Sequence, residues 1–179
     1  MKNRPSTQLL HFIVVFAFLH LPALANDIVL EQRLTEEKEI KAQFEYSFND
    51  IADQIVTVSC ESSRGRSSGS GFIAKMDGKT YLFTNQHVIL GADKIRFKTT
   101  TGTTLRPRGV QLSTSMDIAR LPLEEDAGLL ISKNLAIGAP IAVFGNSEGG
   151  GVATELYGNI TGVGSEIIEV SATFVSGNS

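Results

Sequence analysis

Apolar and polar residues alternate in two series of short runs, and turn-forming residues separate the runs. The first series ends at Leu121 and the second begins near Gly138, so residues 122–137 are predicted to be a linker. Many short strands with few helical stretches favour an all-β sandwich or barrel. The predicted strands are 55–58, 71–74, 81–84, 95–97, 109–112, 118–121, 141–144, 152–156, 160–163 and 167–170. Asp77-Gly78, between two apolar runs, also predicts a tight hairpin.

A different pattern precedes the strands. Residues 28–48 contain good helix formers and neither Gly nor Pro, which predicts one helix. Its apolar positions could form a stripe, but Lys41 interrupts it. The sequence leaves two interpretations of this amino-terminal arm open. The arm packs on the main domain, or it is a coiled-coil segment that joins copies of the chain, although it offers barely three heptads.

The first residues of the chain have the layout of a secretory signal peptide. Lys2 and Arg4 precede a mostly apolar run, residues 9–21, and Ala23-Leu24-Ala25 then gives a small-x-small cleavage pattern. We therefore expect cleavage between Ala25 and Asn26 and export to the periplasm or the medium. An uncleaved membrane anchor is the alternative, but the run is shorter than the ~20 residues that span a bilayer.

Composition limits the kinds of binding and metal site that the chain can contain. The chain is 42% apolar with a formal charge of −3, an ordinary globular composition without the basic excess of a nucleic-acid-binding protein. Two of its three histidines lie in the signal run, which leaves His87 and the single cysteine, Cys60. A structural zinc site needs about four such ligands, so no metal site is expected. We expect Cys60 to be a buried small hydrophobe, with a nucleophilic role as the alternative.

Three residues suited to acyl transfer occur in the order His87, Asp117, Ser179. Each has an ordinary structural interpretation: a histidine at a strand end, a carboxylate in a turn and a serine in a polar tail. Together they have the residue types and the chain order of the triad in the chymotrypsin-type barrel. The order therefore favours nucleophilic catalysis by serine.

The local contexts resemble those of trypsin-like serine peptidases. Residues 84–89 (TNQHVI) resemble the histidine motif, residues 117–121 (DIARL) the aspartate motif, and residues 177–179 (GNS) the first half of the nucleophile motif. Residues 68–73 (SGSGFI) resemble the small-residue strand before the histidine in bacterial members. The greatest likeness is to the protease domain of periplasmic proteases of the high-temperature-requirement type, over residues 50–179.

The resemblance implies the chymotrypsin fold, with two six-stranded-type antiparallel β-barrels. The first barrel would be residues 50–121 and an incomplete second barrel residues 138–179, after a helical arm at 26–49. The sequence ends inside the nucleophile motif, before the strands that normally complete the second barrel. We therefore expect the chain to be a fragment of a longer product, with little or no activity of its own.

The resemblance also implies a role for each site residue. Ser179 would be the nucleophile, His87 the general base and then acid, and Asp117 the residue that orients the imidazole. The backbone N–H groups of Gly177 and Ser179 would form the oxyanion hole. Thr173 would lie at the floor of the primary specificity pocket, where an uncharged residue suggests no preference for Lys or Arg. The carboxylates that compete with Asp117 for the triad are Asp93, Glu125 and Asp126.

The predicted function is therefore an exported serine endopeptidase that acts on polypeptides without a metal or organic cofactor. It would meet the membrane only during export and bind no nucleic acid, and its oligomeric state stays open. A non-catalytic peptide- or protein-binding module on the same fold is the alternative. A hydrolase of esters would use the same machinery, and the sequence does not separate it from a peptidase.

Overall fold

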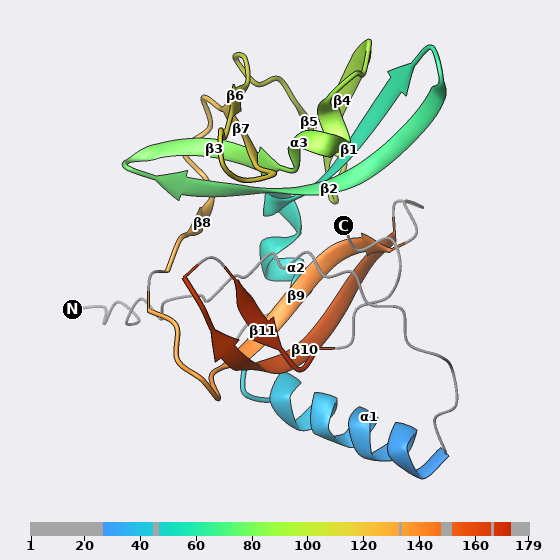
Figure 1. Cartoon of the computed structure of the whole chain (residues 1–179), viewed down its shortest axis with the longest axis vertical. Helices are drawn as coiled ribbons and strands as arrows, with labels where there is room; N and C mark the ends of the chain where they lie inside the picture. The colour runs from blue at the N-terminus through green and yellow to red at the C-terminus, as the bar shows by residue number, and fades with distance from the viewer. Residues whose placement is uncertain (1–26, 45–46, 133, 148–151, 166, 173–179) are drawn as a thin grey trace, which may run out of the picture.

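Two β-sheets, one above the other, make up most of the molecule (Figure 1). The computed structural model describes residues 27–44, 47–132, 134–147, 152–165 and 167–172. The all-β class predicted from the strand pattern is confirmed, and so is the chymotrypsin-like fold that the resemblance implies. The helical elements are α1 (Asp27–Lys41), α2 (Phe48–Ile51), the 3-10 turn η1 (Ala52–Gln54) and α3 (Gln86–Ile89). No helix in the described ranges is both long enough and apolar enough to cross a bilayer.

The upper sheet has eight strands. They are β1 (Ile55–Ser62), β2 (Gly65–Met76), β3 (Lys79–Thr84), β4 (Lys94–Thr99), β5 (Thr104–Leu105), β6 (Gln111–Leu112), β7 (Ala119–Pro122) and β8 (Leu129–Leu130). The pairing order is β5-β4-β1-β2-β3-β7-β6, and every pair on this path is antiparallel. Strand β8 pairs with β2 in parallel and lies within the stretch that the sequence predicts as a linker.

The hairpin predicted at Asp77-Gly78 is present between β2 and β3. Both residues have positive φ, 52° and 73°, as the tight two-residue turns that fit the twist of a hairpin require. Register then places alternate residues of the strands on opposite faces. In β1, Val56 and Val58 are buried while Thr57 between them is half-buried on the other face.

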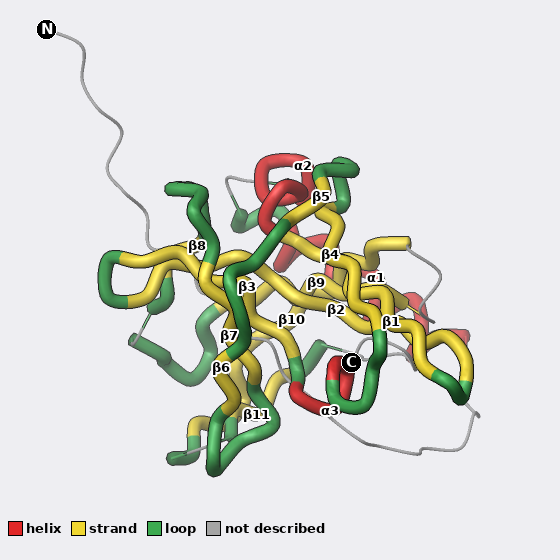
Figure 2. Tube along the Cα trace, turned by 90° about the horizontal axis from the view of Figure 1, so that it is seen from above, coloured by secondary structure: helices red, strands yellow, loops and turns green. Residues whose placement is uncertain are grey.

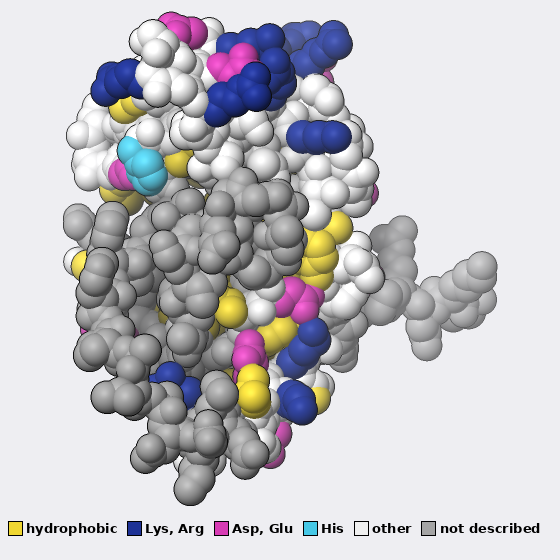
Figure 3. Space-filling model, turned by 90° about the vertical axis from the view of Figure 1, so that its right-hand side faces the viewer, with side chains coloured by type: hydrophobic (Ala, Val, Ile, Leu, Met, Phe, Trp, Pro, Cys, Tyr) yellow, Lys and Arg dark blue, Asp and Glu magenta, His cyan; other side chains and the backbone are white. Residues whose placement is uncertain are grey.

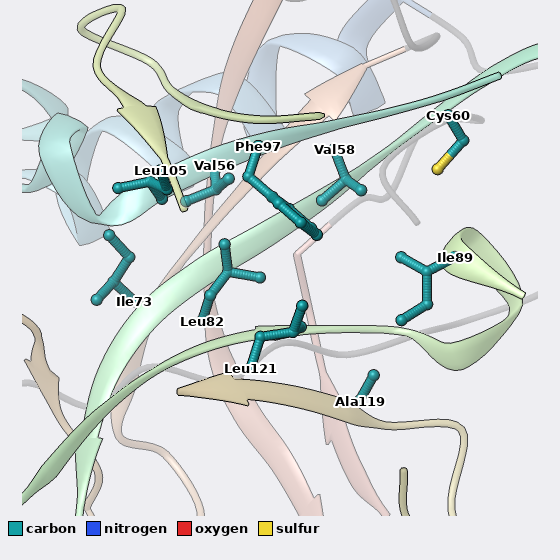
Figure 4. Packing of buried hydrophobic residues seen from close by; sticks show 10 residues of the cluster. All are labelled: Val56, Val58, Cys60, Ile73, Leu82, Ile89, Phe97, Leu105, Ala119 and Leu121. Atoms are coloured by element: carbon teal, nitrogen blue, oxygen red, sulfur yellow. The ribbon is translucent and has the colours of Figure 1, made fainter. Parts of the chain in front are cut away.

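The upper sheet has an apolar cluster on each face, and the larger one lies beneath α3. Figure 4 shows Phe97 of β4 among side chains of β1, β3 and β7, and Ile89 pointing into the same cluster from α3. The core residues are Val56, Val58, Cys60, Ile73, Leu82, Ile89, Phe97, Leu105, Ala119 and Leu121. Ile89 of α3 and Ala119 and Leu121 of β7 all belong to this cluster. The core therefore holds α3 and the start of β7 in place.

The lower sheet has the order β11-β10-β9, with β9 (Pro140–Ser147), β10 (Val152–Val163) and β11 (Ile168–Val170). The sequence pattern predicts two runs where the structure has the single strand β10. The predicted break falls around Gly158, where a Cβ would lie 2.4 Å from the backbone N of Ala172. Gly158 therefore serves a close approach between chain segments and does not end the strand.

The amino-terminal arm differs from the single helix predicted over residues 28–48. Helix α1 ends at Lys41, and a separate short helix, α2, begins at Phe48. Phe44 lies after the end of α1, and its ring packs against the Tyr157 ring of β10, with centroids 5.6 Å apart. Ser47 starts α2, since its N–H and its hydroxyl both donate to Asp50 Oδ2. Competing tertiary and capping contacts thus outweigh local helix propensity.

Helix α1 lies against the lower sheet on the side away from the upper one (Figure 1). Ile40 is buried beside Ala142 and Tyr157. The Lys41 ammonium is 2.6 Å from the Glu155 carboxylate and lies over the Tyr157 ring. These contacts agree with the interpretation in which the arm packs on the main domain.

Candidate active site

His87 is in α3, a single turn that follows the buried end of β3. Two neighbours anchor this turn, because Ile89 lies in the core and Val88 packs against it. Figure 2 places α3 at the edge of the molecule opposite α2. The His87 side chain is 59% exposed, and the histidine in Figure 3 lies at the surface beside an acidic group. The imidazole is therefore accessible although its backbone is firmly held.

Gly69 of β2 allows α3 to approach the sheet. A Cβ built on Gly69 would lie 2.7 Å from Cγ2 of Val88, which is closer than real side chains come. Gly71 is the next residue on the same face of β2. A Cβ built on it would lie 2.7 Å from the carbonyl oxygen of Phe83. Gly69 thus has a packing function beneath the turn that holds His87, and Gly71 lets β2 and β3 lie close together.

Asp117 lies in the turn between β6 and β7 and contacts His87 through both carboxylate oxygens. Oδ2 is 2.5 Å from Nδ1 of the His87 ring, and Oδ1 accepts the His87 backbone N–H at 3.0 Å. Asn85 Nδ2 donates to the backbone carbonyl of Asp117 at 2.9 Å and to Oδ2 at 3.2 Å. The carboxylate is therefore fixed relative to both the ring and the backbone of α3.

Partial burial would raise the pKa of Asp117, but the hydrogen bonds and the charge of His87, together with the Asn85 bond, outweigh it and lower the pKa. Asp117 is consequently ionised at neutral pH and can only accept hydrogen bonds. The short contact then requires Nδ1 of His87 to carry a hydrogen. In a neutral ring this leaves the lone pair on Nε2, the nitrogen that can take a proton from a nucleophile.

The competing carboxylates have other surroundings. Asp126 pairs with Lys75 at 2.8 Å, and this interaction lowers its pKa. Asp93 is the residue directly before β4, and its backbone N–H donates to the carbonyl of Glu61. Glu125 is exposed in the predicted linker. Among the residues that the structure describes, Asp117 is the carboxylate bonded to His87.

Cys60 is buried in β1, as expected, and its thiol donates to the Val88 carbonyl at 3.1 Å. Burial raises the pKa of this thiol, which favours the unreactive protonated form. Its environment therefore suits a packing role beneath α3 better than a nucleophilic one.

The other predicted site residues lie outside the described residues. These are Ser179, Gly177, Thr173 and the two residues of the predicted signal cleavage, Ala25 and Asn26.

Asn85 and Gln86, for which the sequence predicted no role of their own, contribute directly to the arrangement. The Gln86 side chain donates to three backbone carbonyls of the turn that holds Asp117. Their adjacency to His87 was visible in the sequence, but the partners of their amides were not.

Comparison with known proteins identifies relatives of this chain. Residues 69–179 match the family described as the trypsin-like peptidase domain. A probable periplasmic serine endoprotease, DegP-like, of Halomonas elongata is 37% identical over 92 residues, which cover 49% of this chain and 19% of that protein. The crystal structure of a serine endoprotease from Yersinia pestis superposes with a TM-score of 0.59 at 27% identity, and covers 76% of this chain.

The chain spans 19% of the length of the curated relative and 52% of the solved one. The matched region begins at Gly69 and includes β3, α3 and the turn of Asp117, so it contains the whole His87–Asp117 arrangement. With the antiparallel sheets, this match makes the chain a member of the trypsin-like peptidase domain family.

Proposed function

We propose that this chain is the protease domain of an exported serine endopeptidase that cleaves polypeptides through His87, Asp117 and Ser179. The single observation that supports this most strongly is the Asp117 carboxylate on Nδ1 of His87, at 2.5 Å. It is the contact that a general-base histidine needs from its orienting acid. Membership in the peptidase family is the second, independent support.

In the proposed mechanism Ser179 Oγ attacks the scissile carbonyl carbon while its proton moves to Nε2 of His87. The backbone N–H groups of Gly177 and Ser179 stabilise the oxyanion that forms. When the C–N bond breaks, Nε2 returns the proton to the leaving amine, and an acyl-enzyme ester remains on Ser179. A water molecule, deprotonated by His87, then hydrolyses the ester and regenerates the serine. Asp117 stays ionised throughout and stabilises the imidazolium.

Export is part of the proposal. The basic residues, apolar run and Ala23-Leu24-Ala25 pattern support it, as does the periplasmic assignment in the name of the Halomonas relative. Thr173 as an uncharged floor of the specificity pocket leads us to expect cleavage after uncharged residues in preference to Lys or Arg.

The test uses the product of the complete reading frame, unmodified and with Ser179→Ala. We expect the unmodified protein to hydrolyse an unstructured polypeptide and the variant to have no activity above background. Matched ester and amide substrates, compared by kcat/KM, separate a peptidase from an esterase. Tight binding of the polypeptide without turnover would instead favour a binding module.

A further inference from the structure

One side chain, that of Gln86, donates to three backbone carbonyls of the β6–β7 turn that presents Asp117. Its amide nitrogen, Nε2, lies 2.6 Å from the Ser113 carbonyl oxygen, 2.8 Å from that of Met116 and 3.2 Å from that of Ile118. These three residues are spread along the turn on both sides of Asp117. One amide group, from the residue before His87 in the chain, therefore spans the whole turn.

The amide nitrogen has two hydrogens and three acceptors, so at least one of these hydrogens is shared between two carbonyl oxygens. The turn has internal bonds of its own, since the Ile118 N–H donates to Met116 and the Ser113 N–H donates to Ile118. Those bonds fix the shape of the turn but do not tie it to α3. Gln86 joins the turn to α3 through side-chain donors, while Asn85 and His87 bind Asp117 itself.

We propose that Gln86 is a positioning residue for catalysis: its amide sets the distance between the Asp117 carboxylate and the His87 ring. This inference rests on the proposed function for its effect on turnover, but not for its effect on geometry. A methylene chain fixed at α3 holds Nε2, and Nε2 holds the turn. Without these donors the Ser113 carbonyl would turn to water, and the Met116 and Ile118 carbonyls would keep only their bonds within the turn. Asp117 would then be tied to this end of the sheet only by its direct bonds to Asn85 and His87.

The test substitutes Gln86→Met, which keeps the length of the side chain and removes its donors. The matched control is Gln43→Met, which removes an exposed amide from the arm. That amide makes a long 3.5 Å contact with the Glu39 carbonyl, within the arm itself. Both proteins are prepared as the full chain. The first readout is the Nδ1 proton of His87, observed by NMR with labelled histidine and assigned by its loss in His87→Ala.

We expect a downfield Nδ1 proton signal in the unmodified protein and in Gln43→Met. In Gln86→Met we expect that signal to move upfield or to broaden through exchange, because the contact with Asp117 is lengthened. A carboxyl-carbon titration should show the pKa of Asp117 rising toward its ordinary value in the same variant. A residue that merely stabilised the fold would lower the thermal midpoint and leave both signals unchanged.

The second readout is turnover by the product of the complete reading frame. Because small displacements of catalytic groups are costly, we expect Gln86→Met to lower kcat about 10- to 100-fold with little change in KM. If Gln86→Met does not fold, Gln86→Asn replaces it, since its shorter amide reaches fewer of the carbonyls and should give a smaller change in the same direction. An unaltered Nδ1 proton and an unaltered Asp117 titration in a folded variant would overturn the proposal. The NMR readout does not depend on Ser179, so loss of the proposed function alone would leave it intact.

Discussion

Val88 occupies the space above Gly69, and the two residues approach so closely that any side chain at position 69 would collide with Val88 Cγ2. Since Val88 follows His87 directly, this contact sets how near α3 lies to the sheet. It connects the glycine-containing stretch of β2 with the imidazole through packing alone.

Gly69→Ala should therefore displace α3. We expect a loss of about 1–3 kcal/mol in the free energy of unfolding, as for other overpacked cores, measured by urea denaturation. In the complete protein kcat should also fall, because His87 moves with Val88. Ser67→Ala is the matched control on the same strand, since Ser67 is exposed and its variant should lie within about 0.5 kcal/mol of the unmodified protein. Equal stabilities for the two variants would contradict this account of Gly69.

The sequence predicted the elements whose pattern is local. The longer strands of the upper sheet and the Asp77-Gly78 hairpin follow from period-two alternation and from residues that accept positive φ. Features set by distant partners were missed. Helix α1 ends early because Phe44 packs on Tyr157, and β10 continues through Gly158 because Ala172 comes close there. Strands β5 and β8 have only two residues each, too few to show a period.

The residues of the candidate site likewise fall into those that the sequence predicted and those that it did not. His87 and Asp117 were identifiable because their residue types and flanking motifs are distinctive, and the structure places them in contact. The roles of Asn85 and Gln86 depend on which carbonyls come within reach of their amides. That is decided by the fold of the β6–β7 turn, which one sequence does not reveal.

The contact between Asp117 and His87 predicts a pH-dependent contribution to stability. Because the pKa of Asp117 is lower in the folded chain than in the unfolded one, the contribution is complete above the unfolded pKa, ~3.9. It is lost as the pH falls through the folded pKa. The difference in free energy of unfolding between the unmodified chain and Asp117→Asn should thus be largest near neutral pH and shrink below about pH 4.

Urea denaturation at several pH values measures this difference. Repeating the series in the background of His87→Ala provides the control, because Asp117 there lacks the imidazole, whose hydrogen bond and charge contribute to its lowered pKa. The acid dependence should be weaker in that background. A difference of the same size at pH 7 and pH 2.5 would show that the carboxylate gains nothing from folding.

Glu155 joins the arm to the lower sheet. Its carboxylate accepts from the Lys41 ammonium at 2.6 Å and from the Phe48 backbone N–H at 2.9 Å. Glu155→Ala should leave that half-buried N–H without its acceptor and cost about 1–3 kcal/mol. Lys41→Met removes the partly exposed ion pair and the cation–π contact with Tyr157, but it leaves the Phe48 N–H with its acceptor, so it should cost about 1 kcal/mol. Amide hydrogen exchange over α1 and α2 should accelerate in Glu155→Ala more than in Lys41→Met; the reverse order would contradict the assignment.

Asp117→Asn tests the orienting role directly. The amide preserves the size of the side chain but can present a donor to Nδ1, which stabilises the wrong tautomer of His87. In the complete protein kcat should fall about 10³- to 10⁴-fold while KM changes little. Asp126→Asn, which alters a carboxylate paired with Lys75, should retain full activity. Comparable losses in the two variants would remove Asp117 from the proposed triad.

The central claim is that Ser179 is a nucleophile activated by His87, and a fluorophosphonate probe tests it most directly. We expect the product of the complete reading frame to be labelled stoichiometrically at Ser179, with mass spectrometry locating the adduct. Labelling should be absent in Ser179→Ala and slowed by orders of magnitude in His87→Ala. Labelling that persists in Ser179→Ala, or that proceeds equally fast without the imidazole, would contradict the claim.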